Sequence, residues 1–176
     1  THISRNIYGV AWLQDSRHMI FHLDQEGNEN HHIHLVDTEK PGAKPVDITP
    51  YKGTKAWVHK VLKSDPDNIL IQHNRRNKKV FDLFRINIKT RESTLIAENP
   101  GNVSSWITDD GGNLRGRVLK NHPENRSKNL DKYWVFETLD AENIGSPVIS
   151  WRLDESVSIL GFTPDDKGVW LISNKG

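Results

Sequence analysis

Tryptophan recurs in this chain at a spacing that few folds produce. Trp12, Trp57 and Trp106 are separated by 45 and 49 residues, and within ten residues each is followed by an acidic or Gly-rich turn. A stretch rich in β-forming residues follows each turn. Self-similarity at roughly 40–50 residues is typical of repeated four-stranded propeller blades. Because such a blade buries its sheet faces only against neighbouring blades, the repeat predicts an all-β chain built as an arc of blades.

The repeat divides the 176-residue chain into three whole blades and one partial blade. The expected blades span approximately residues 7–50, 51–100, 101–152 and, for the partial blade, 153–176. Each whole unit contains four strand-like segments and the last contains two, which gives 14 strands. We therefore expect a single partial β-propeller over residues 1–176, with about three and a half four-stranded antiparallel blades.

The local sequence supports strands and turns throughout. The segments are short, rich in Val, Ile, Leu, Phe and Trp, and bounded by Gly, Pro, Asn and Asp clusters. Polar and apolar residues alternate in Arg85–Ile88 and in His32–Leu35, as in half-buried strands. The apolar run Ile69–Ile71 indicates a strand that is covered on both faces. No stretch shows a helical period.

Composition excludes several classes of function. The chain has 24 Lys and Arg against 23 Asp and Glu, so we expect neither a nucleic-acid partner nor a membrane partner. It has no cysteine, which rules out disulfides and thiolate metal sites. No apolar run approaches the ~20 residues that a membrane-spanning helix needs. None of this indicates a cellular compartment.

Several segments resemble those of one family of peptidases. They are the Trp-x-x-Asp turn at Trp12–Asp15, the turn Thr163–Gly168, the hairpin Gly27–Asn30 before His31–Asp37, the close Asp47–Pro50 and the strand Phe81–Ile86. Taken together, these segments resemble the N-terminal β-propeller of prolyl oligopeptidase-family serine peptidases. The acylaminoacyl-peptidase-like and dipeptidyl-peptidase-like branches are the nearest, and TolB-like propellers share the same blade organisation. The resemblance covers essentially the whole chain and is best in the first two units.

The resemblance implies a role without catalysis for this chain. Such peptidases carry a Ser-Asp-His triad on an α/β-hydrolase domain that follows the propeller, with the serine in a Gly-x-Ser-x-Gly elbow. The chain contains no such elbow and no βαβ alternation. Ser104 and Ser105 lie within an expected strand, where nothing would activate a hydroxyl. We therefore expect no catalytic residue, and a propeller portion that restricts the access of peptides to a C-terminal α/β-hydrolase domain as its partner.

The alternative function is a free-standing binding propeller of the TolB or WD type. Its rim or central channel would hold a protein or a small ligand, with no hydrolase attached. The reading frame downstream of Gly176 discriminates between the two. A Gly-x-Ser-x-Gly elbow followed by Asp and His indicates the peptidase, whereas a stop codon after further blades indicates the binding module.

A group of histidines is the one candidate for a metal site. His31, His32 and His34 lie on one expected strand, and His18 and His22 on its expected hairpin partner. Because His32 and His34 share a face, a zinc or nickel site that includes Glu29 is conceivable. The spacing matches no recognised ligand pattern, however, so the favoured interpretation is solvent-facing residues on a hairpin. We expect neither a metal site nor a cofactor site.

The basic turn Arg75–Lys79 could contact phosphates or an acidic partner, although four charges at a hairpin tip usually form a solvated turn.

The recurring tryptophans, Trp12, Trp57 and Trp106, could stack on a ligand. Their equivalent positions in successive blades instead favour packing between blades, with each indole buried.

The remaining polar motifs have simple structural explanations. The carboxylate pairs Asp109–Asp110 and Asp165–Asp166 are expected to cap turns rather than to act as an acid and a base. Asn102 and Asn125 begin glycosylation sequons. The polar insertion Asn121–Asp131 is expected to extend the hairpin of the third blade.

An arc of blades leaves one sheet face uncovered and one half-blade with an unpaired edge. Surfaces of this kind promote association. We therefore expect the chain to self-associate through its open blade edges.

Overall fold

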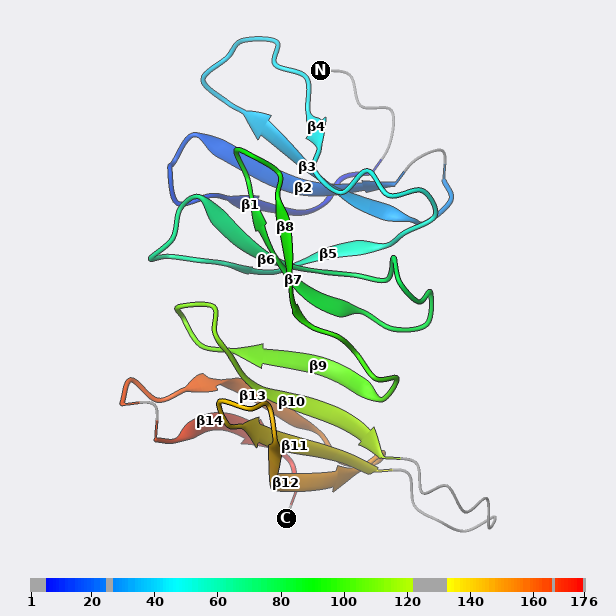
Figure 1. Cartoon of the computed structure of the whole chain (residues 1–176), viewed down its shortest axis with the longest axis vertical. Coiled ribbons are helices and arrows are strands. Elements are labelled where there is room, and N and C mark those ends of the chain that lie inside the picture. The colour runs from blue at the N-terminus through cyan, green and yellow to red at the C-terminus, as the bar shows by residue number, and fades with distance from the viewer. Residues whose placement is uncertain (1–5, 25–26, 122–132, 166, 176) are drawn as a thin grey trace. The chain divides into compact units, whose positions relative to one another are not determined.

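The computed structural model describes residues 6–24, 27–121, 133–165 and 167–175. Within these ranges the chain forms 14 strands in four antiparallel sheets (Figure 1). The described residues include no helix, and so none long and apolar enough to cross a membrane. The predicted fold class, an all-β chain of four-stranded blades ending in a half-blade, is confirmed.

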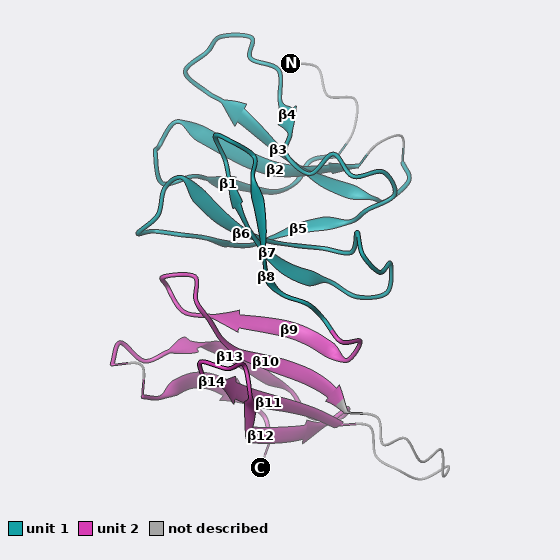
Figure 2. Ribbon diagram, in the orientation of Figure 1, with its two compact units in different colours: residues 1–99 teal, residues 100–176 magenta. Residues whose placement is uncertain are grey.

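Unit 1, one of two compact units into which the chain divides, spans Thr1–Asn99 and contains two four-stranded sheets (Figure 2). Sheet A contains, in spatial order, β1 (Tyr8–Trp12), β2 (His18–Asp24), β3 (His31–Asp37) and β4 (Val46–Asp47). Sheet B contains β5 (Ala56–Val61), β6 (Asn68–His73), β7 (Asp82–Asn87) and β8 (Ser93–Ala97). In both sheets each strand pairs with its neighbour in sequence, which is the meander expected of a blade.

Unit 2 spans Pro100–Gly176 and contains one whole sheet and one half sheet. Sheet C contains β9 (Val103–Thr108), β10 (Leu114–Asn121), β11 (Tyr133–Leu139) and β12 (Gly145–Arg152). Sheet D contains only β13 (Val157–Phe162) and β14 (Val169–Ser173). The expected hairpin loop Asn121–Asp131 falls almost wholly outside the described residues. That residues 1–176 form a single propeller remains a prediction.

The core of unit 1 lies between the facing surfaces of sheets A and B. It is almost entirely aliphatic, and its buried members are Leu13, Ile20, Ile33, Ile48, Ala56, Ile69, Ile71, Ile86 and Ile88. Ile20 and Ile33 have no exposed surface, and neither do Ile71 and Ile86 on the opposite sheet. Each such side chain contributes about 1.5–3 kcal/mol when it leaves water. Neither sheet of unit 1 would keep this face dry alone.

The core of unit 2 is built around Phe136, which is fully buried with Val118 and Trp151. Gly116 on the neighbouring strand makes room for it. A Cβ atom at Gly116 would lie 2.8 Å from the Phe136 ring and 2.8 Å from the Glu137 carbonyl oxygen. Only glycine therefore allows β10 to run this close to β11.

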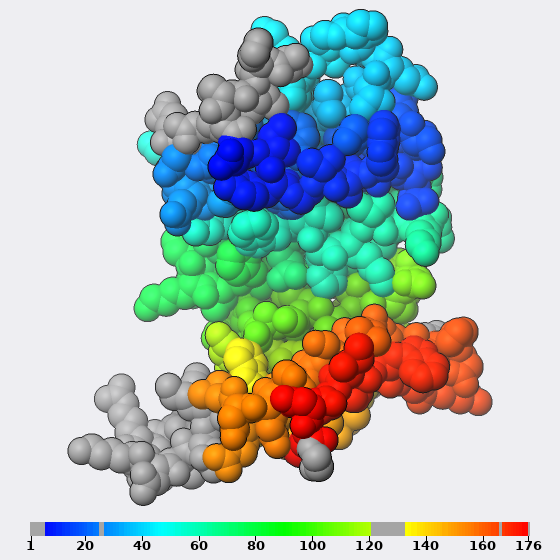
Figure 3. Space-filling model, turned by 180° about the vertical axis from the view of Figure 1, so that it is seen from behind, coloured from blue at the N-terminus to red at the C-terminus, as the bar shows by residue number. Residues whose placement is uncertain are grey.

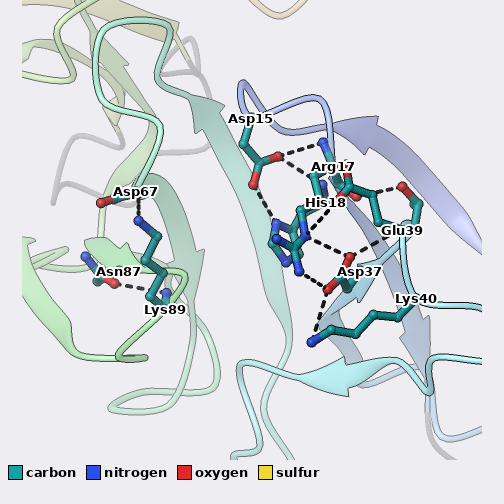
Figure 4. Close-up of polar contacts among 10 residues, drawn as sticks. Asp15, Arg17, His18, Asp37, Glu39, Lys40, Asp67, Asn87 and Lys89 are labelled. Carbon is teal, nitrogen blue, oxygen red and sulfur yellow. Dashed lines mark hydrogen bonds and ion pairs between the residues drawn. The ribbon is translucent and has the colours of Figure 1, made fainter.

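Charged side chains fix the turn between β1 and β2 (Figure 4). Asp15 accepts hydrogen bonds from the backbone amides of Arg17 (3.0 Å) and His18 (2.9 Å) and from the His18 ring (2.5 Å). Burial raises the pKa of Asp15, but the hydrogen bonds from His18 and Arg17 outweigh it and lower the pKa to about 2. Arg17 also donates two bonds to Asp37 (2.9 and 2.6 Å), and Lys40 lies 3.3 Å from Asp37. The turn is thereby tied to the end of β3.

The three recurring tryptophans are not equivalent. Trp106, the fourth residue of β9, is 4% exposed, as predicted for packing between blades. Trp57, the second residue of β5, is 39% exposed, and Trp12, the last residue of β1, is 54% exposed. The prediction of buried positions was therefore wrong for these two. β1, β5 and β9 are all edge strands of their sheets, so edge position alone does not decide burial; Figure 3 shows β1, in dark blue, on the surface of unit 1. The spacing located the first strand of each blade but not the register within it.

Two histidines of sheet B, the buried His73 and the half-buried His59, escaped the sequence analysis. His73, at the end of β6, stacks on Phe84 with ring centroids 3.9 Å apart, and His59 lies 2.9 Å from the Gln72 side-chain amide. Burial lowers the pKa of His59 to about 4, with a further effect of Lys60, and burial likewise lowers the pKa of His73 to about 4. Both rings are therefore neutral in the folded chain near neutral pH.

We predict that replacing Trp106 by Ala lowers the free energy of unfolding by about 3–5 kcal/mol, because it removes a buried aromatic side chain from a packed sheet. The matched control is Trp12→Ala, which removes an exposed indole and should change the free energy by less than about 1 kcal/mol. Urea unfolding followed by circular dichroism measures both. Equal destabilisation by the two variants would contradict the assigned burial.

We also predict that the free energy of unfolding falls as the pH is lowered from about 6.5 to about 4. Over this window the unfolded chain binds protons at His59 and His73 that the folded chain does not, at a cost of at most about 1.4 kcal/mol per pH unit for each histidine. Asp15 acts in the same sense but in a lower window: because its pKa is lowered to about 2, the stability that it contributes is lost as the pH falls from about 4 towards 2.

The variant His73→Phe tests this assignment, because it keeps the stack on Phe84 and removes the titrating group. It should reduce the pH dependence between pH 6.5 and 4, measured by urea unfolding at each pH, and leave the share of His59, His22 and His34, whose pKa values burial also lowers. A slope identical to that of the unmodified chain would show that His73 is not the source.

Candidate functional site

A hollow of about 800 Å³ opens in unit 1 where strand ends of sheets A and B meet. Its lining residues are Asn6, Tyr8, Asp24, Glu29, His31, Lys55 and Trp57. Tyr8 begins β1, while Asp24 at the end of β2 pairs directly with His31 at the start of β3. Lys55 and Trp57 flank the start of β5. Antiparallel pairing therefore gathers residues that are distant in sequence at one end of the two sheets.

The aromatic rings of this hollow are ordered by mutual contact. Trp57 stacks on His31 with ring centroids 5.3 Å apart and an interplanar angle of 30°. Tyr8 meets the same imidazole edge-on, at 5.4 Å and 85°. His22 lies on Trp57 as well, at 5.3 Å and 45°. Such contacts hold the rings in place and leave Trp57 and Tyr8 39% and 50% exposed.

His22 also connects the two sheets directly. Its Nε2 accepts a hydrogen bond from the Val58 backbone amide at 3.1 Å, which requires an unprotonated nitrogen. Burial lowers the pKa of His22 and so favours this neutral form. Gly9, with φ of 58°, makes the approach possible, because a Cβ there would lie 2.7 Å from His22 Nδ1. The position of Trp57 next to sheet A therefore depends on a histidine and a glycine of sheet A.

One polar atom of the hollow lacks a partner. His31 Nδ1 is shielded from solvent and makes no hydrogen bond, and it is the one buried side-chain nitrogen or oxygen in this condition among the described residues. Buried polar atoms are nearly always hydrogen-bonded, so an orphaned one requires an explanation such as a bound group.

The histidines of this hairpin contact different neighbours and do not converge on one point. His22 and His31 face Trp57, whereas the His32 ring lies 2.6 Å from Asp47 Oδ2 and the His34 ring stacks on Phe21. In the ranges that the structure covers, no three His, Cys, Asp or Glu residues come together to hold an ion.

The interpretation of these histidines as solvent-facing was also wrong. His22, His32 and His34 are 7%, 4% and 9% exposed. The alternation of strand faces separated the histidines as expected, but both faces of the hairpin are covered at these positions. Burial lowers the pKa of His34 as it does that of His22.

The basic turn makes more internal contacts than a solvated turn would. Arg76 donates two hydrogen bonds to Asp82, at 2.9 and 2.7 Å, and a third to the Asn99 carbonyl oxygen at 2.7 Å. These bonds to Asp82 raise the pKa of Arg76. Arg75 lies 4.4 Å above the centre of the Tyr51 ring. Both arginines are therefore committed to the fold of unit 1.

Ser104 and Ser105 line a second hollow, of about 500 Å³, within unit 2. Its other lining residues are Ile107, Val118, Trp134, Trp151, Glu155, Ser156, Val157, Ser158 and Ile159. None of these described lining residues is a histidine or a lysine that could act as a base for a serine hydroxyl.

The acidic turns act as caps. Asp109 accepts hydrogen bonds from the Asn113 backbone amide at 2.8 Å and from Arg115 at 3.5 Å. Burial raises the pKa of Asp109, but these bonds outweigh it and the pKa lies below its usual value. Asp165 accepts from the Thr163 hydroxyl at 2.5 Å, which lowers its pKa. Of the other motif residues, Asn102 is exposed just before β9, while Asn125 and Asp166 lie outside the described residues.

Sequence comparison finds a peptidase. No family model matches the chain. The chain is 27% identical over 106 residues to dipeptidyl aminopeptidase BIII of Pseudoxanthomonas mexicana, a match that covers 60% of this chain and 15% of that protein. The chain thus spans a small part of the length of this relative.

Structural comparison finds propellers. TolB from Acinetobacter baumannii superimposes with a TM-score of 0.51 at 16% identity, covering 89% of this chain and 35% of TolB. An acylaminoacyl peptidase in complex with Z-Gly-Gly-Phe-chloromethyl ketone gives 0.50 at 15% identity, covering 86% of this chain and 26% of the peptidase. At these identities the likeness concerns the fold. The expected resemblance is confirmed: the chain consists of β-propeller blades that are similar in sequence to a dipeptidyl aminopeptidase and in fold to TolB and to an acylaminoacyl peptidase.

Proposed function

We propose that this chain is the non-catalytic propeller portion of a prolyl oligopeptidase-family serine peptidase, and that it restricts the access of peptides to an α/β-hydrolase domain. The observation that carries the proposal is the similarity to a dipeptidyl aminopeptidase over 106 residues, in a chain that folds into propeller blades. In support of a non-catalytic role, no histidine or lysine is found among the described residues that line the hollow at Ser104 and Ser105.

Packed blades are suited to selection by size. Their cores are fully buried aliphatic side chains, such as Ile20 and Ile71, so the sheets resist deformation by an entering substrate. An extended peptide is about 5 Å wide, which is the spacing between neighbouring strands. A folded domain of 100 residues is much wider, with a radius of gyration of about 13 Å. A passage bordered by such sheets admits the first and excludes the second.

The second candidate function is a free-standing binding module, which the fold similarity to TolB favours. The reading frame downstream of Gly176 separates the two candidates. A hydrolase domain with a Gly-x-Ser-x-Gly elbow supports the peptidase, and further blades followed by a stop codon support the binding module.

We predict that the protein carrying this chain cleaves a short peptide at least 100-fold faster, by kcat/KM, than the same peptide held in a loop of a folded carrier domain. The expected ratio corresponds to about 2.7 kcal/mol of added barrier. Mass spectrometry of both digests measures it. Equal rates would contradict gating.

As the control, the 176-residue chain alone should remain unlabelled by a fluorophosphonate probe. Labelling of Ser104 or Ser105 would overturn its non-catalytic role.

Sheet D offers a surface for a second copy of the chain. One face packs on the Phe136 core through Val157, Ile159 and Val169. The outward residues Leu160, Trp170 and Ile172 are 62%, 62% and 63% exposed. Among the described strands β14 pairs with β13 alone, so its second edge is open. Two copies of β14 paired antiparallel about a two-fold axis would form a four-stranded sheet, the size of sheets A, B and C.

We therefore predict that the 176-residue chain is a dimer at micromolar concentration and that Leu171→Pro makes it a monomer. Proline removes a backbone donor and disfavours pairing at a strand edge. Trp170→Ala should weaken the dimer without blocking the edge. Sedimentation equilibrium measures all three proteins. A single 20.2 kDa species for the unmodified chain would show that sheet D does not pair in this way.

A further inference from the structure

A single histidine bridges sheets A and B at the end where β1 and β5 begin. His22, on β2, contacts β1 of its own sheet through Nδ1 and β5 of the neighbouring sheet through Nε2. We propose that His22 is an acid-sensitive latch, which holds the start of β5 against sheet A while its ring is neutral and releases it when the ring takes up a proton. The inference goes beyond the proposed function, because it concerns this chain alone and needs no hydrolase domain.

The two hydrogen bonds of His22 fix where its ring carries the hydrogen. A carbonyl oxygen only accepts, so Nδ1 donates to the Tyr8 carbonyl oxygen, 3.3 Å away. A backbone amide only donates, so Nε2 accepts from the Val58 amide, 3.1 Å away. Both conditions are met by one form, the neutral imidazole with its hydrogen on Nδ1. A protonated ring would turn an N–H toward the Val58 N–H and so replace this bond by a contact between two donors.

The bond to Val58 is one that sheet B does not make for itself. β5 is an edge strand, and its ladder with β6 is interrupted just after Val58. The Val58 amide finds its acceptor in sheet A instead. Because loss of this bond would leave a half-buried donor unpaired, protonation of His22 favours separation of the strands, so that water can reach both groups.

The closed structure holds the His22 ring on two sides. Gly9, with φ of 58°, passes so close that a Cβ there would lie 2.7 Å from His22 Nδ1. On another side the Trp57 ring lies 5.3 Å from the His22 ring, centroid to centroid. His22 is buried, so a charged imidazole in this place would lose its hydration. Uptake of a proton is therefore coupled to release.

The neighbours of His22 on β1 and β3 leave this preference in place. Burial lowers the pKa of His22, the backbone groups of Tyr8 and Gly9 raise it, and positive charge on His31 and His34 lowers it again. The pKa in the closed structure lies below its usual value of 6.5. The neutral ring is thus the form that the closed structure selects.

Other ionisable groups lie near this junction of the two sheets. On β5, the His59 ring is 2.9 Å from the Gln72 side-chain amide. Lys55, just before β5, lines the hollow together with Asp24, Glu29 and His31. Of these groups, His31 shares the Trp57 ring with His22, so the experiment has to separate the two histidines.

The latch releases in mild acid. Below about pH 6.5 a released imidazole takes up a proton that the closed ring refuses. The equilibrium constant for opening therefore rises as the pH falls, by at most about tenfold per pH unit, and stops rising at the lowered pKa of the closed ring. The start of β5 is held at neutral pH, and in acid it moves away together with Trp57, which widens the hollow.

The experiment is hydrogen exchange of the 15N-labelled 176-residue chain between pH 7 and pH 5, expressed as protection factors. The value for the Val58 amide is divided by that for Ile86, which is fully buried on β7 and reports global unfolding. Division removes the contribution of His59 and His73 to global stability. We expect the ratio to fall several-fold toward pH 5 and the Trp57 indole signal to shift with the same midpoint. A ratio constant within about twofold, or a Val58 amide unprotected at pH 7, would overturn the inference.

Variants assign the proton to His22. His22→Gln keeps an acceptor near the position of Nε2 and does not titrate, so Val58 should stay protected at every pH. His22→Asn is too short to reach Val58, and its ratio should already be low at pH 7. The matched control His18→Gln removes a titrating ring from the same strand, one that contacts Asp15 rather than β5, and it should leave the pH dependence unchanged.

The remaining variant is His31→Gln, which keeps His22 and its bond to Val58. The fall of the ratio in acid should persist in it. Loss of the fall in His31→Gln, together with its persistence in His22→Gln, would overturn the inference. No outcome bears on gating, because neither a hydrolase domain nor a peptide takes part in the measurement.

Discussion

The fold of unit 1 depends on the contact between the faces of sheets A and B. A four-stranded meander with an aliphatic face is not stable in water alone, so Ile20 and Ile33 require Ile71 and Ile86 opposite them. This contact brings the start of β5 close to the start of β1, and the hydrogen bond from Val58 to His22 then fixes the spacing of the two sheets at their shared end.

The same contact explains why chemistry is concentrated at the ends of strands. The facing surfaces of sheets A and B are buried against each other, so the edge strands and the turns remain accessible. Tyr8 and Trp57 lie at strand starts for this reason, on β1 and β5, which are edge strands. Gly9 is part of the same arrangement, because a larger residue would displace His22 and with it the contact to Trp57. The hollow is thus a product of how two sheets meet.

The sequence predicted the architecture well and the site poorly, for a physical reason. Strand periodicity and turn residues are local, so the 14 strands and their grouping into three whole sheets and a half sheet could be anticipated. Burial depends on what covers each face. Trp12 and Trp106 look alike in sequence and differ from 54% to 4% in exposure. The hollow joins β1 to β5, and no local pattern encodes the meeting of two sheets.

The partners of charged residues were missed for the same reason. Arg76 looks like a solvated side chain at a hairpin tip, but Asp82, its partner, is only 1% exposed and also accepts a hydrogen bond from the Asn99 backbone amide at 2.7 Å. A carboxylate this deeply buried requires a cation, so a basic residue near an acidic one in a tight turn is better interpreted as a structural pair.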